Sequence, residues 1–552
     1  MFVPVPSPEE MSRWDAEAIH LGMAEEVLME NAARCAMDSL RQHWAAKGRT
    51  LAEASVLLRA GSGNNGGDAF CMSRHLLDAG ARPVLVCTRS PEEYRGAASH
   101  WLKVAISLGV PTFSAETWEQ GDDAIPARPD IAVDGLLGTG FRGALREREA
   151  RLVEKFNRLG SALVLAVDIP SGLDSRTGRP CPDAVRAHVT VSFQAAKPGL
   201  LVPEARPFTG RVDVRPIGMP RRVQEEQRPS FRTWLLPAQM PGDRASSSFP
   251  CEVPAASAPS AARWTSPAHK GEAGRVLVLG GCSDYVGAPC LAGLAALRTG
   301  AGLVTVAGPE AVLNAVRFSM PALTTQSLSL PAGPDVPEWS ADALPPLAPA
   351  IASSKALVFG PGLGRTEGAA DFAEALLALP QCPPMVLDAD ALFALARRPH
   401  LLKLLRPCDV LTPHPGEAAT LLGIPAAEVQ ADRFAALEKL AGLAPAVWVL
   451  KGAGTLIAVP HEPSVISPWD VPQLAVAGSG DVLAGAIGAF LARGHTSGLA
   501  AALGVWLHVL AGRRLSQTFP MRGNGPHDIA DALPSVLPAL GEPCKGDICL
   551  SF

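Results

Sequence analysis

A glycine-rich segment in the C-terminal half places an acid beside a run of backbone amides. Ala477-Gly478-Ser479-Gly480-Asp481 precedes Val482–Leu491, an apolar stretch with the composition of a helix. Several N–H groups and a carboxylate would then lie at a helix N-terminus, where the helix dipole favours an anion. The segment predicts stabilisation of a phosphoryl group in transfer, with Asp481 accepting the proton of an attacking hydroxyl. A glycine turn whose helix is capped by Asp481 is the alternative interpretation.

A second glycine-rich segment lies in the N-terminal half. The apolar run Ser55–Ala60 leads into Gly61-Ser62-Gly63-Asn64-Asn65-Gly66-Gly67-Asp68, and a helical stretch follows. Such a strand-to-helix loop turns successive N–H groups toward one point, so it predicts phosphate binding rather than an ordinary turn. The segment is not a P-loop, because no Gly-Lys-Ser/Thr follows.

Two acids follow further apolar runs of this half. Asp134 stands in Val133-Asp134-Gly135, and Asp168 begins Asp168-Ile169-Pro170-Ser171-Gly172. Ligands of open α/β sheets bind beyond the carboxyl ends of the strands, so we expect both acids on the rim that carries Asn64–Asp68. Carboxylates, amide oxygens and a hydroxyl gathered there can bind a hard cation or move protons. A single strand-end Asp is otherwise often a helix cap.

Apolar runs that alternate with amphipathic stretches must position these residues. The alternation occurs in two blocks and predicts an α/β fold with parallel sheets. Between the blocks, Pro, Ala, Ser and charged residues dominate, so we predict a first domain over 1–220, a linker over 221–263 and a second domain over 264–552. The predicted strands are 55–60, 84–87, 131–133, 162–167, 275–279, 303–307, 356–359, 384–387, 410–411 and 446–450.

Composition excludes several classes of protein. The chain has 552 residues, more than one hydrophobic core usually serves. A net charge of -5 leaves no field that would attract nucleic acid. Eleven cysteines without zinc spacing, and an N-terminus without a signal-peptide pattern, predict a cytoplasmic protein with reduced thiols. The uncharged stretch Gly494–Gly512 carries two histidines and predicts a buried helix rather than a membrane span.

Taken together, the N-terminal segments resemble the NAD(P)H-hydrate epimerase family over about Met11–Gly218. The resemblance implies a Rossmann-like, three-layer αβα domain in which Asp168 contacts the substrate and Lys197, in Ala-Ala-Lys-Pro-Gly, takes part in proton transfer. A surface lysine is the alternative for Lys197. Potassium would be bound with help from Asn65, Asp134 and Ser171. The hydrated nicotinamide would contact Asn64, Asn65, Gly66, Gly67, Asp68, Gly138, Thr139, Gly140, Phe141, Arg142, Gly143 and Ala144.

In the second block, further segments accompany the glycine-rich one, each at or just after a predicted strand. They are Tyr285-Val286-Gly287-Ala288-Pro289, Gly360-Pro361-Gly362-Leu363-Gly364, Asp388-Ala389-Asp390, Pro413-His414-Pro415-Gly416-Glu417 and Lys451-Gly452-Ala453-Gly454-Thr455. Lys451 adds a cation beside flexible backbone suited to nucleotide phosphates, although a β-hairpin turn is the alternative there. His414 alone would more often be structural, but between two prolines it is held rigidly and is expected to face the pocket.

The set closely resembles ADP-dependent NAD(P)H-hydrate dehydratase, a member of the ribokinase-like superfamily, over about Ala268–Leu540. The resemblance implies that magnesium bridges the phosphates of ADP. The nucleotide would lie over Lys451, Gly452, Ala453, Gly454, Thr455 and Gly480. The hydrated nicotinamide would be lined by Ala288, Gly362 or Gly364, His414 and Asp481.

The two resemblances imply one repair function on one chain. The first domain would interconvert the R and S forms of hydrated NADH and NADPH. The second would dehydrate the S form at the expense of ADP, giving NAD(P)H, AMP and phosphate. We expect small-molecule substrates, no nucleic-acid or membrane partner, and a homo-oligomer. The alternative is a ribokinase-like kinase of a vitamin precursor joined to a noncatalytic binding module, since that superfamily shares the Gly-x-Gly-Asp site.

Overall fold

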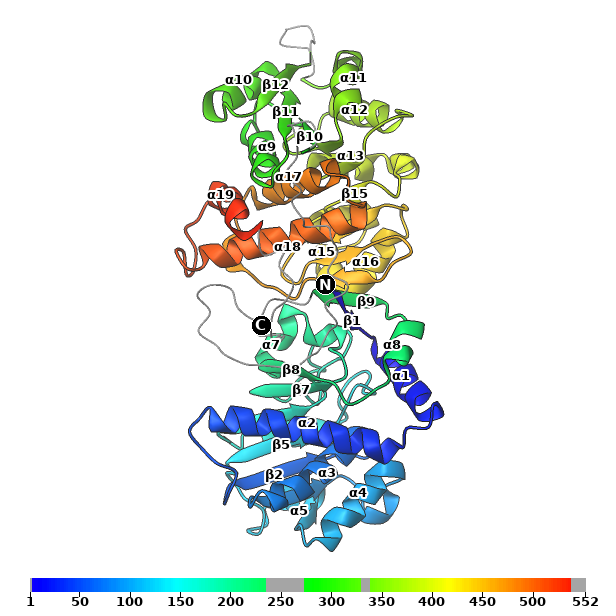
Figure 1. Ribbon diagram of the computed structural model, residues 1–552, viewed down its shortest axis with the longest axis vertical. Helices are drawn as coiled ribbons and strands as arrows, with labels where there is room; N and C mark the ends of the chain where they lie inside the picture. The colour runs from blue at the N-terminus through cyan, green and yellow to red at the C-terminus, as the bar shows by residue number, and fades with distance from the viewer. Residues whose placement is uncertain (1, 235–272, 329–337, 538–552) are drawn as a thin grey trace. The chain divides into compact units, whose positions relative to one another are not determined.

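The computed structural model describes residues 2–234, 273–328 and 338–537 (Figure 1). Of these, residues 2–234 form one compact unit, and residues 273–537, apart from the undescribed 329–337, form the other. Both units are built on largely parallel sheets flanked by helices, so the predicted α/β class is confirmed. Among the described residues no helix has the length and apolarity needed to span a bilayer.

The N-terminal unit contains a parallel sheet with the order β4-β3-β2-β5-β6-β7-β8. In register, Leu57 lies opposite both Val84 and Ala132. The strands are continuous apolar runs because both faces of the sheet are covered. Their bounds are β2 (Ser55–Ala60), β3 (Arg82–Cys87), β4 (Thr112–Ser114), β5 (Ile131–Gly135), β6 (Leu163–Val167), β7 (Val189–Phe193) and β8 (Arg211–Arg215).

Side chains of alternate residues on β2 enter two different cores. Val56 and Leu58 pack in a cluster with residues of α2, α3 and α4, whereas Leu57 packs with residues of α5 and α6. The sheet is therefore the middle layer of a three-layer αβα unit, as predicted. Its longer helices are α1 (Pro8–His20), α2 (Glu25–Ala45), α3 (Asn64–Asp78), α4 (Gly96–Ser107), α5 (Ala115–Gln120) and α6 (Glu147–Asn157).

The predicted linker begins too early at residue 221. Residues 221–234 contain α8 (Arg221–Glu226) and β9 (Phe231–Trp234), and β9 pairs antiparallel with β1 (Phe2–Val5). Trp14 Nε1 donates a hydrogen bond of 2.9 Å to the carbonyl of Gln227, which ties the segment to α1. The polar composition of residues 221–226 suggested a linker, although one fully buried residue, Val223, anchors this helix. The rest of the predicted linker, 235–263, lies outside the described residues.

In the C-terminal unit the sheet runs in the order β18-β17-β16-β15-β14-β13-β10-β11-β12, parallel from β16 to β12. The hairpin strands β17 and β18 are antiparallel to their neighbours. The bounds are β10 (Arg275–Leu279), β11 (Leu303–Gly308), β12 (Thr324–Ser327), β13 (Ala356–Phe359), β14 (Met385–Leu387), β15 (Val410–Leu411), β16 (Val447–Leu450), β17 (Leu456–Ala458) and β18 (Ser464–Ile466).

Small residues let the buried helices of this unit approach closely. A Cβ on Gly485 of α17 would lie 2.1 Å from the carbonyl oxygen of Ala292 on α9, and a Cβ on Gly504 of α18 would lie 2.4 Å from the Ile487 side chain. This packing fixes the start of α17, the helix that opens with Asp481. The principal helices are α9 (Gly287–Arg298), α10 (Glu310–Ser319), α11 (Leu344–Ser353), α12 (Glu367–Leu377), α13 (Asp390–Arg397), α14 (Pro415–Leu422), α16 (Arg433–Ala441), α17 (Ser479–Ala492), α18 (Ser497–Leu515) and α19 (Pro526–Val536).

Candidate active sites

A cavity of about 550 Å³ opens at the carboxyl ends of β2, β5 and β6. It brings together much of the residue set expected from the sequence, and α1 and α2 line it with apolar side chains as well as with Asp15 and Glu25. Gly66, Gly67 and the stretch 142–144 do not line it, and Arg142 instead pairs with Glu9. The expected residues that do line it are Asn64, Asn65, Asp68, Gly138, Thr139, Gly140, Phe141, Asp168 and Lys197.

Asp168 and Lys197 form a buried ion pair in this cavity. The ammonium of Lys197 pairs with the carboxylate of Asp168 and donates hydrogen bonds of 3.1 Å to Ser192 Oγ and to the carbonyl of Phe193. The Lys197 side chain is only 1% exposed, so it is not a surface lysine. Asp168 has a φ of 61°, a left-handed conformation that is uncommon for residues other than glycine and concentrates at functional sites.

The positive charge of Lys197 also acts on two further carboxylates of the cavity, Asp15 and Asp68. Burial raises the pKa of Asp15, on α1, to about 6, and Lys197 only partly opposes the effect. Burial and the nearby charges of Asp168 and Asp15 raise the pKa of Asp68 well above its ordinary value. The cavity therefore holds acids that can exchange protons near neutral pH. Sequence reasoning missed Asp15, because only the fold brings α1 to this rim.

Asp134 lies beneath the rim rather than in the cavity. Its fully buried carboxylate pairs with Arg59 Nη2 at 2.9 Å and accepts hydrogen bonds from Ser171 N at 2.7 Å and Ser171 Oγ at 2.8 Å. Asn65 Nδ2 donates bonds of 2.8 Å to the carbonyls of Leu137 and Val167. These contacts bind the loops after β2, β5 and β6 to one another, and they place several oxygen atoms below the cavity.

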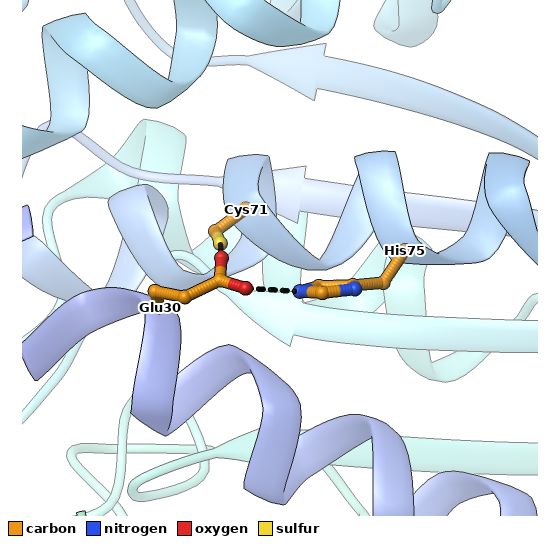
Figure 2. Close-up of side chains that lie close together, drawn as sticks. All are labelled: Glu30, Cys71 and His75. Carbon is orange, nitrogen blue, oxygen red and sulfur yellow. Dashed lines mark hydrogen bonds and ion pairs between the residues drawn. The ribbon is translucent and has the colours of Figure 1, made fainter. Parts of the chain in front are cut away.

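Glu30, Cys71 and His75 cluster between α2 and α3 (Figure 2). Their potential metal-ligand atoms lie within 4.8 Å of one another, in the only such group among the residues that the structure describes. However, Arg74 Nη2 lies 2.8 Å and 2.9 Å from the two carboxylate oxygens of Glu30 and 3.0 Å from His75 Nε2. Because the guanidinium already supplies the positive charge, we interpret the cluster as a structural link between the two helices.

Replacing Glu30 by Ala should destabilise the N-terminal unit. The change leaves Arg74 and Cys71 without the carboxylate that accepts their hydrogen bonds. We expect a loss of about 1–3 kcal/mol in the free energy of unfolding, measured by denaturant titration. Glu26→Ala on the same helix is the control and should change it by less than about 0.5 kcal/mol. Equal stability of the two variants would contradict the structural role.

A cavity of about 590 Å³ lies in the C-terminal unit. Ala288, Gly362, Gly364 and Asp481 all line it, together with Tyr285 and other side chains. Asp481 lies in the first turn of α17, whose N-cap Gly478 has a φ of 87°. Burial, and then the charge of Asp388, raise the pKa of Asp481 to about 8. The acid therefore has a proton affinity suited to general-base catalysis near neutral pH.

Lys451 lies against a group of carboxylates. Its Nζ is 2.6 Å from Asp388 Oδ1 and 3.7 Å from Glu417 Oε2, and a Cβ on Gly480 would lie 3.2 Å from it. Burial raises the pKa of Glu417 to about 7. The stretch Lys451–Thr455 joins the antiparallel strands β16 and β17, so it is a hairpin connection as well as the expected cationic loop. Sequence reasoning gave no role to Asp388 or Glu417.

His414 caps a helix. Its Nδ1 accepts hydrogen bonds of 3.0 Å and 3.2 Å from the backbone amides of Gly416 and Glu417 at the start of α14. Partial burial and the nearby charge of Lys451 lower the pKa of this imidazole. The side chain is 55% exposed and does not line the cavity that Asp481 lines. Its Nε2 lies 3.4 Å from Glu417 Oε1.

The two sites define a class of protein. Each unit gathers glycine-rich backbone, a strand-end or helix-start acid and a lysine paired with carboxylates at one edge of a parallel sheet, which is typical of α/β enzymes that handle phosphorylated ligands. Residues 276–535 match the family described as NAD(P)H-hydrate dehydratase, and residues 25–199 match the family described as YjeF-related protein N-terminus.

Relatives extend the match to nearly the whole chain. The chain is 38% identical over 524 residues to the bifunctional NAD(P)H-hydrate repair enzyme Nnr of Moorella thermoacetica, covering 94% of this chain and 93% of the relative. For the enzyme of the same name from Escherichia coli K12 the identity is 32%, covering 87% and 84%. The ADP/ATP-dependent NAD(P)H-hydrate dehydratase structure from Bacillus subtilis is 29% identical, with a TM-score of 0.41, and covers 50% of this chain and 92% of that one. The chain belongs to the family of bifunctional NAD(P)H-hydrate repair enzymes.

Proposed function

We propose that the chain repairs hydrated NADH and NADPH in two steps. The N-terminal unit interconverts the R and S epimers, and the C-terminal unit dehydrates the S epimer with ADP, giving NAD(P)H, AMP and phosphate. The observation that carries the proposal is Asp481, held at the amide-bearing start of α17 in a cavity that it shares with Ala288 and Gly362. We also propose a homo-oligomer and a cytoplasmic location; the eight free cysteines among the described residues are consistent with the location.

In the epimerase site, Asp168 and Lys197 would carry out proton transfer at the epimerising carbon. Because Lys197 is buried and shared among acids, its proton can pass to Asp168 without reaching bulk water. The substrate would lie against Asn64, Asn65, Asp68 and residues 138–141, which line the cavity. Asn65, Asp134 and Ser171, with the carbonyls of Leu137 and Val167, offer the oxygen donors that potassium binds, and bound potassium would add a positive charge beneath the glycine-rich loops.

In the dehydratase site, Asp481 would accept the proton of the substrate hydroxyl as that oxygen attacks the β-phosphoryl group of ADP. The N–H groups at the start of α17 would stabilise the transferring group, and Lys451, beside Gly480, would offset its charge. Phosphate would then leave with the hydroxyl oxygen, a ring proton would be lost and the double bond would return. Asp388 and Glu417 supply carboxylate oxygens that suit magnesium, whose charge would screen the nucleotide phosphates. His414 does not line the Asp481 cavity, so its contact with the substrate would be made outside that cavity.

The direct experiment mixes the purified full chain with hydrated NADH and ADP. Absorbance at the reduced-nicotinamide band should return while AMP and phosphate form in equal amounts. No recovery of absorbance, with ADP left intact, would overturn the dehydratase proposal and favour a ribokinase-like kinase of another small molecule.

The raised pKa of Asp481 predicts the pH dependence of dehydration. A general base must be ionised, and burial holds the pKa of this carboxyl at about 8. We therefore expect kcat/KM for dehydration to rise about tenfold per pH unit below pH 8 and to level off above it. Epimerisation by the same protein, assayed at each pH, is the control and should not show this limb. A dehydration profile that stays flat from about pH 6 to about pH 9 would contradict the assignment of Asp481 as the base.

A further inference from the structure

A second cavity of the N-terminal unit takes no part in the chemistry described above. It encloses about 930 Å³ at the carboxyl ends of β3 and β4. Ser62, Leu136 and Leu137 line both this cavity and the one that contains Asp168. The two cavities therefore meet at the glycine-rich loop between β2 and α3, on either side of the start of α3.

The glycines of that loop have the spacing and surroundings of a dinucleotide-binding loop. Gly61, Gly63 and Gly66 form Gly-x-Gly-x-x-Gly directly after β2 and at the start of α3. A Cβ on Gly61 would lie 1.8 Å from the carbonyl oxygen of Leu136, and one on Gly66 would lie 1.9 Å from the carbonyl oxygen of Gly61. No atom lies within 4 Å of a Cβ placed on Gly63. The outer glycines permit close packing, and the middle one leaves the backbone open to a pyrophosphate.

The order of the strands in the sheet indicates which half of a bound dinucleotide would lie on which side of the glycine-rich loop. In the order β4-β3-β2-β5-β6-β7, the chain runs outward from β2 to β4 on one side and from β5 to β7 on the other. The loop after β2 therefore lies at the point where the order reverses, and a dinucleotide there extends one half to each side. Asp168 and Lys197 lie on the β5 and β6 side, so the reactive nicotinamide half belongs there. The adenosine half would extend over β3 and β4, into the second cavity.

We infer that the second cavity binds the adenosine half of the hydrated dinucleotide and that Arg89 recognises its 2′-phosphate, so that the epimerase site favours NADPH hydrate over NADH hydrate. This inference rests on the proposed epimerase function. Domains that bind NAD carry an Asp or Glu about 20 residues beyond the glycine loop, where it accepts a hydrogen bond from the ribose 2′-hydroxyl. Here Thr88-Arg89-Ser90 follows β3 at that distance.

The charges around Arg89 permit this role. Arg89 lines the cavity and is about half exposed, and its ion pair with Glu93, at 3.3 Å, is equally exposed. Such exposed pairs contribute little, so a phosphate can displace Glu93. Arg146 and Arg148 also line the cavity, beside Glu149, which accepts a hydrogen bond from Arg146 N, and Glu116, which pairs with Arg148. The guanidinium of Arg89 suits bidentate contact with a phosphate.

The test compares epimerisation of NADPH hydrate and NADH hydrate by the full chain and by Arg89→Ala. We expect KM for NADPH hydrate to rise about tenfold or more with kcat unchanged, and KM for NADH hydrate to stay within about twofold. Arg89→Lys should recover part of the affinity as a point charge. Arg82→Ala is the matched control, because Arg82 is an exposed arginine at the opposite end of β3.

Each outcome decides between the inference and the function on which it rests. If the unaltered chain epimerises neither hydrate, the proposed function fails. If it epimerises them but Arg89→Ala leaves both KM values unchanged, or raises both equally, the recognition of the 2′-phosphate by Arg89 is wrong. As an independent measurement, adenosine 2′,5′-bisphosphate should inhibit epimerisation by the unaltered chain more strongly than 5′-AMP, and Arg89→Ala should abolish that difference. Equal inhibition of the unaltered chain by the two nucleotides would overturn the inference.

Discussion

Asp481→Asn should nearly abolish dehydration while leaving epimerisation intact. Asparagine keeps the shape of the side chain but cannot accept the hydroxyl proton, so we expect kcat for dehydration to fall about 100- to 10,000-fold. The measurement is the ADP-dependent return of reduced-nicotinamide absorbance from purified S hydrate. The effect is large because burial has already tuned this carboxyl, with a pKa of about 8, to hold and release a proton near neutral pH.

Two controls separate loss of the base from loss of the fold. Asp531→Asn makes the same chemical change at an exposed ion pair with Arg298 and should leave dehydration within about twofold. Epimerisation by Asp481→Asn itself, measured from R hydrate, reports on the other unit and should be unchanged. If Asp481→Asn retains more than about a tenth of the dehydration rate, another group is the base.

The central strands were predictable because they are buried on both faces and appear as short apolar runs that end in Gly, Asp or Lys. Two of the strands that escaped prediction lack that signal. β4 (Thr112–Ser114) is only three residues long, and β7 (Val189–Phe193) interleaves Thr190 and Ser192 with its apolar residues although all five are buried. The predicted domain boundary at residue 220 lies too early, because α8 and β9 follow it. The polar composition of this segment gave no sign that the buried Val223 anchors α8.

The motif residues indicated where the sites lie, but not which charged side chains surround the acids in them. Asp168 and Asp481 could be expected at strand ends and helix starts because ligands of α/β sheets bind there. The charged neighbours of these acids come from distant elements: Asp15 comes from α1, and Asp388, whose charge helps to raise the pKa of Asp481, follows β14. No local pattern marks Asp15, and the strand-end position of Asp388 did not reveal its effect on Asp481, because such effects depend on burial and on distance in the folded chain.

Asp168→Asn should confine repair to one epimer. If the dehydratase accepts only the S hydrate, the R half of an equal mixture can be repaired only after epimerisation. We expect epimerisation to slow about 100- to 10,000-fold, so that recovery of NADH stops near half, while purified S hydrate is dehydrated at the unaltered rate. Lys197→Met should act in the same direction, because it removes the ammonium that Asp168 contacts.

The controls are Asp78→Asn and Lys103→Met, which make the same chemical changes at exposed positions of α3 and α4. Spontaneous epimerisation without enzyme must be subtracted, since it would also consume the R hydrate. Complete consumption of both epimers by Asp168→Asn above that background would contradict the assignment.

The double variant Asp168→Asn with Lys197→Met distinguishes two mechanisms. If Asp168 and Lys197 share one proton, the double variant should be no slower than the slower single variant, because residues that act as a unit are not additive. Additive losses would mean that the two residues act in separate steps.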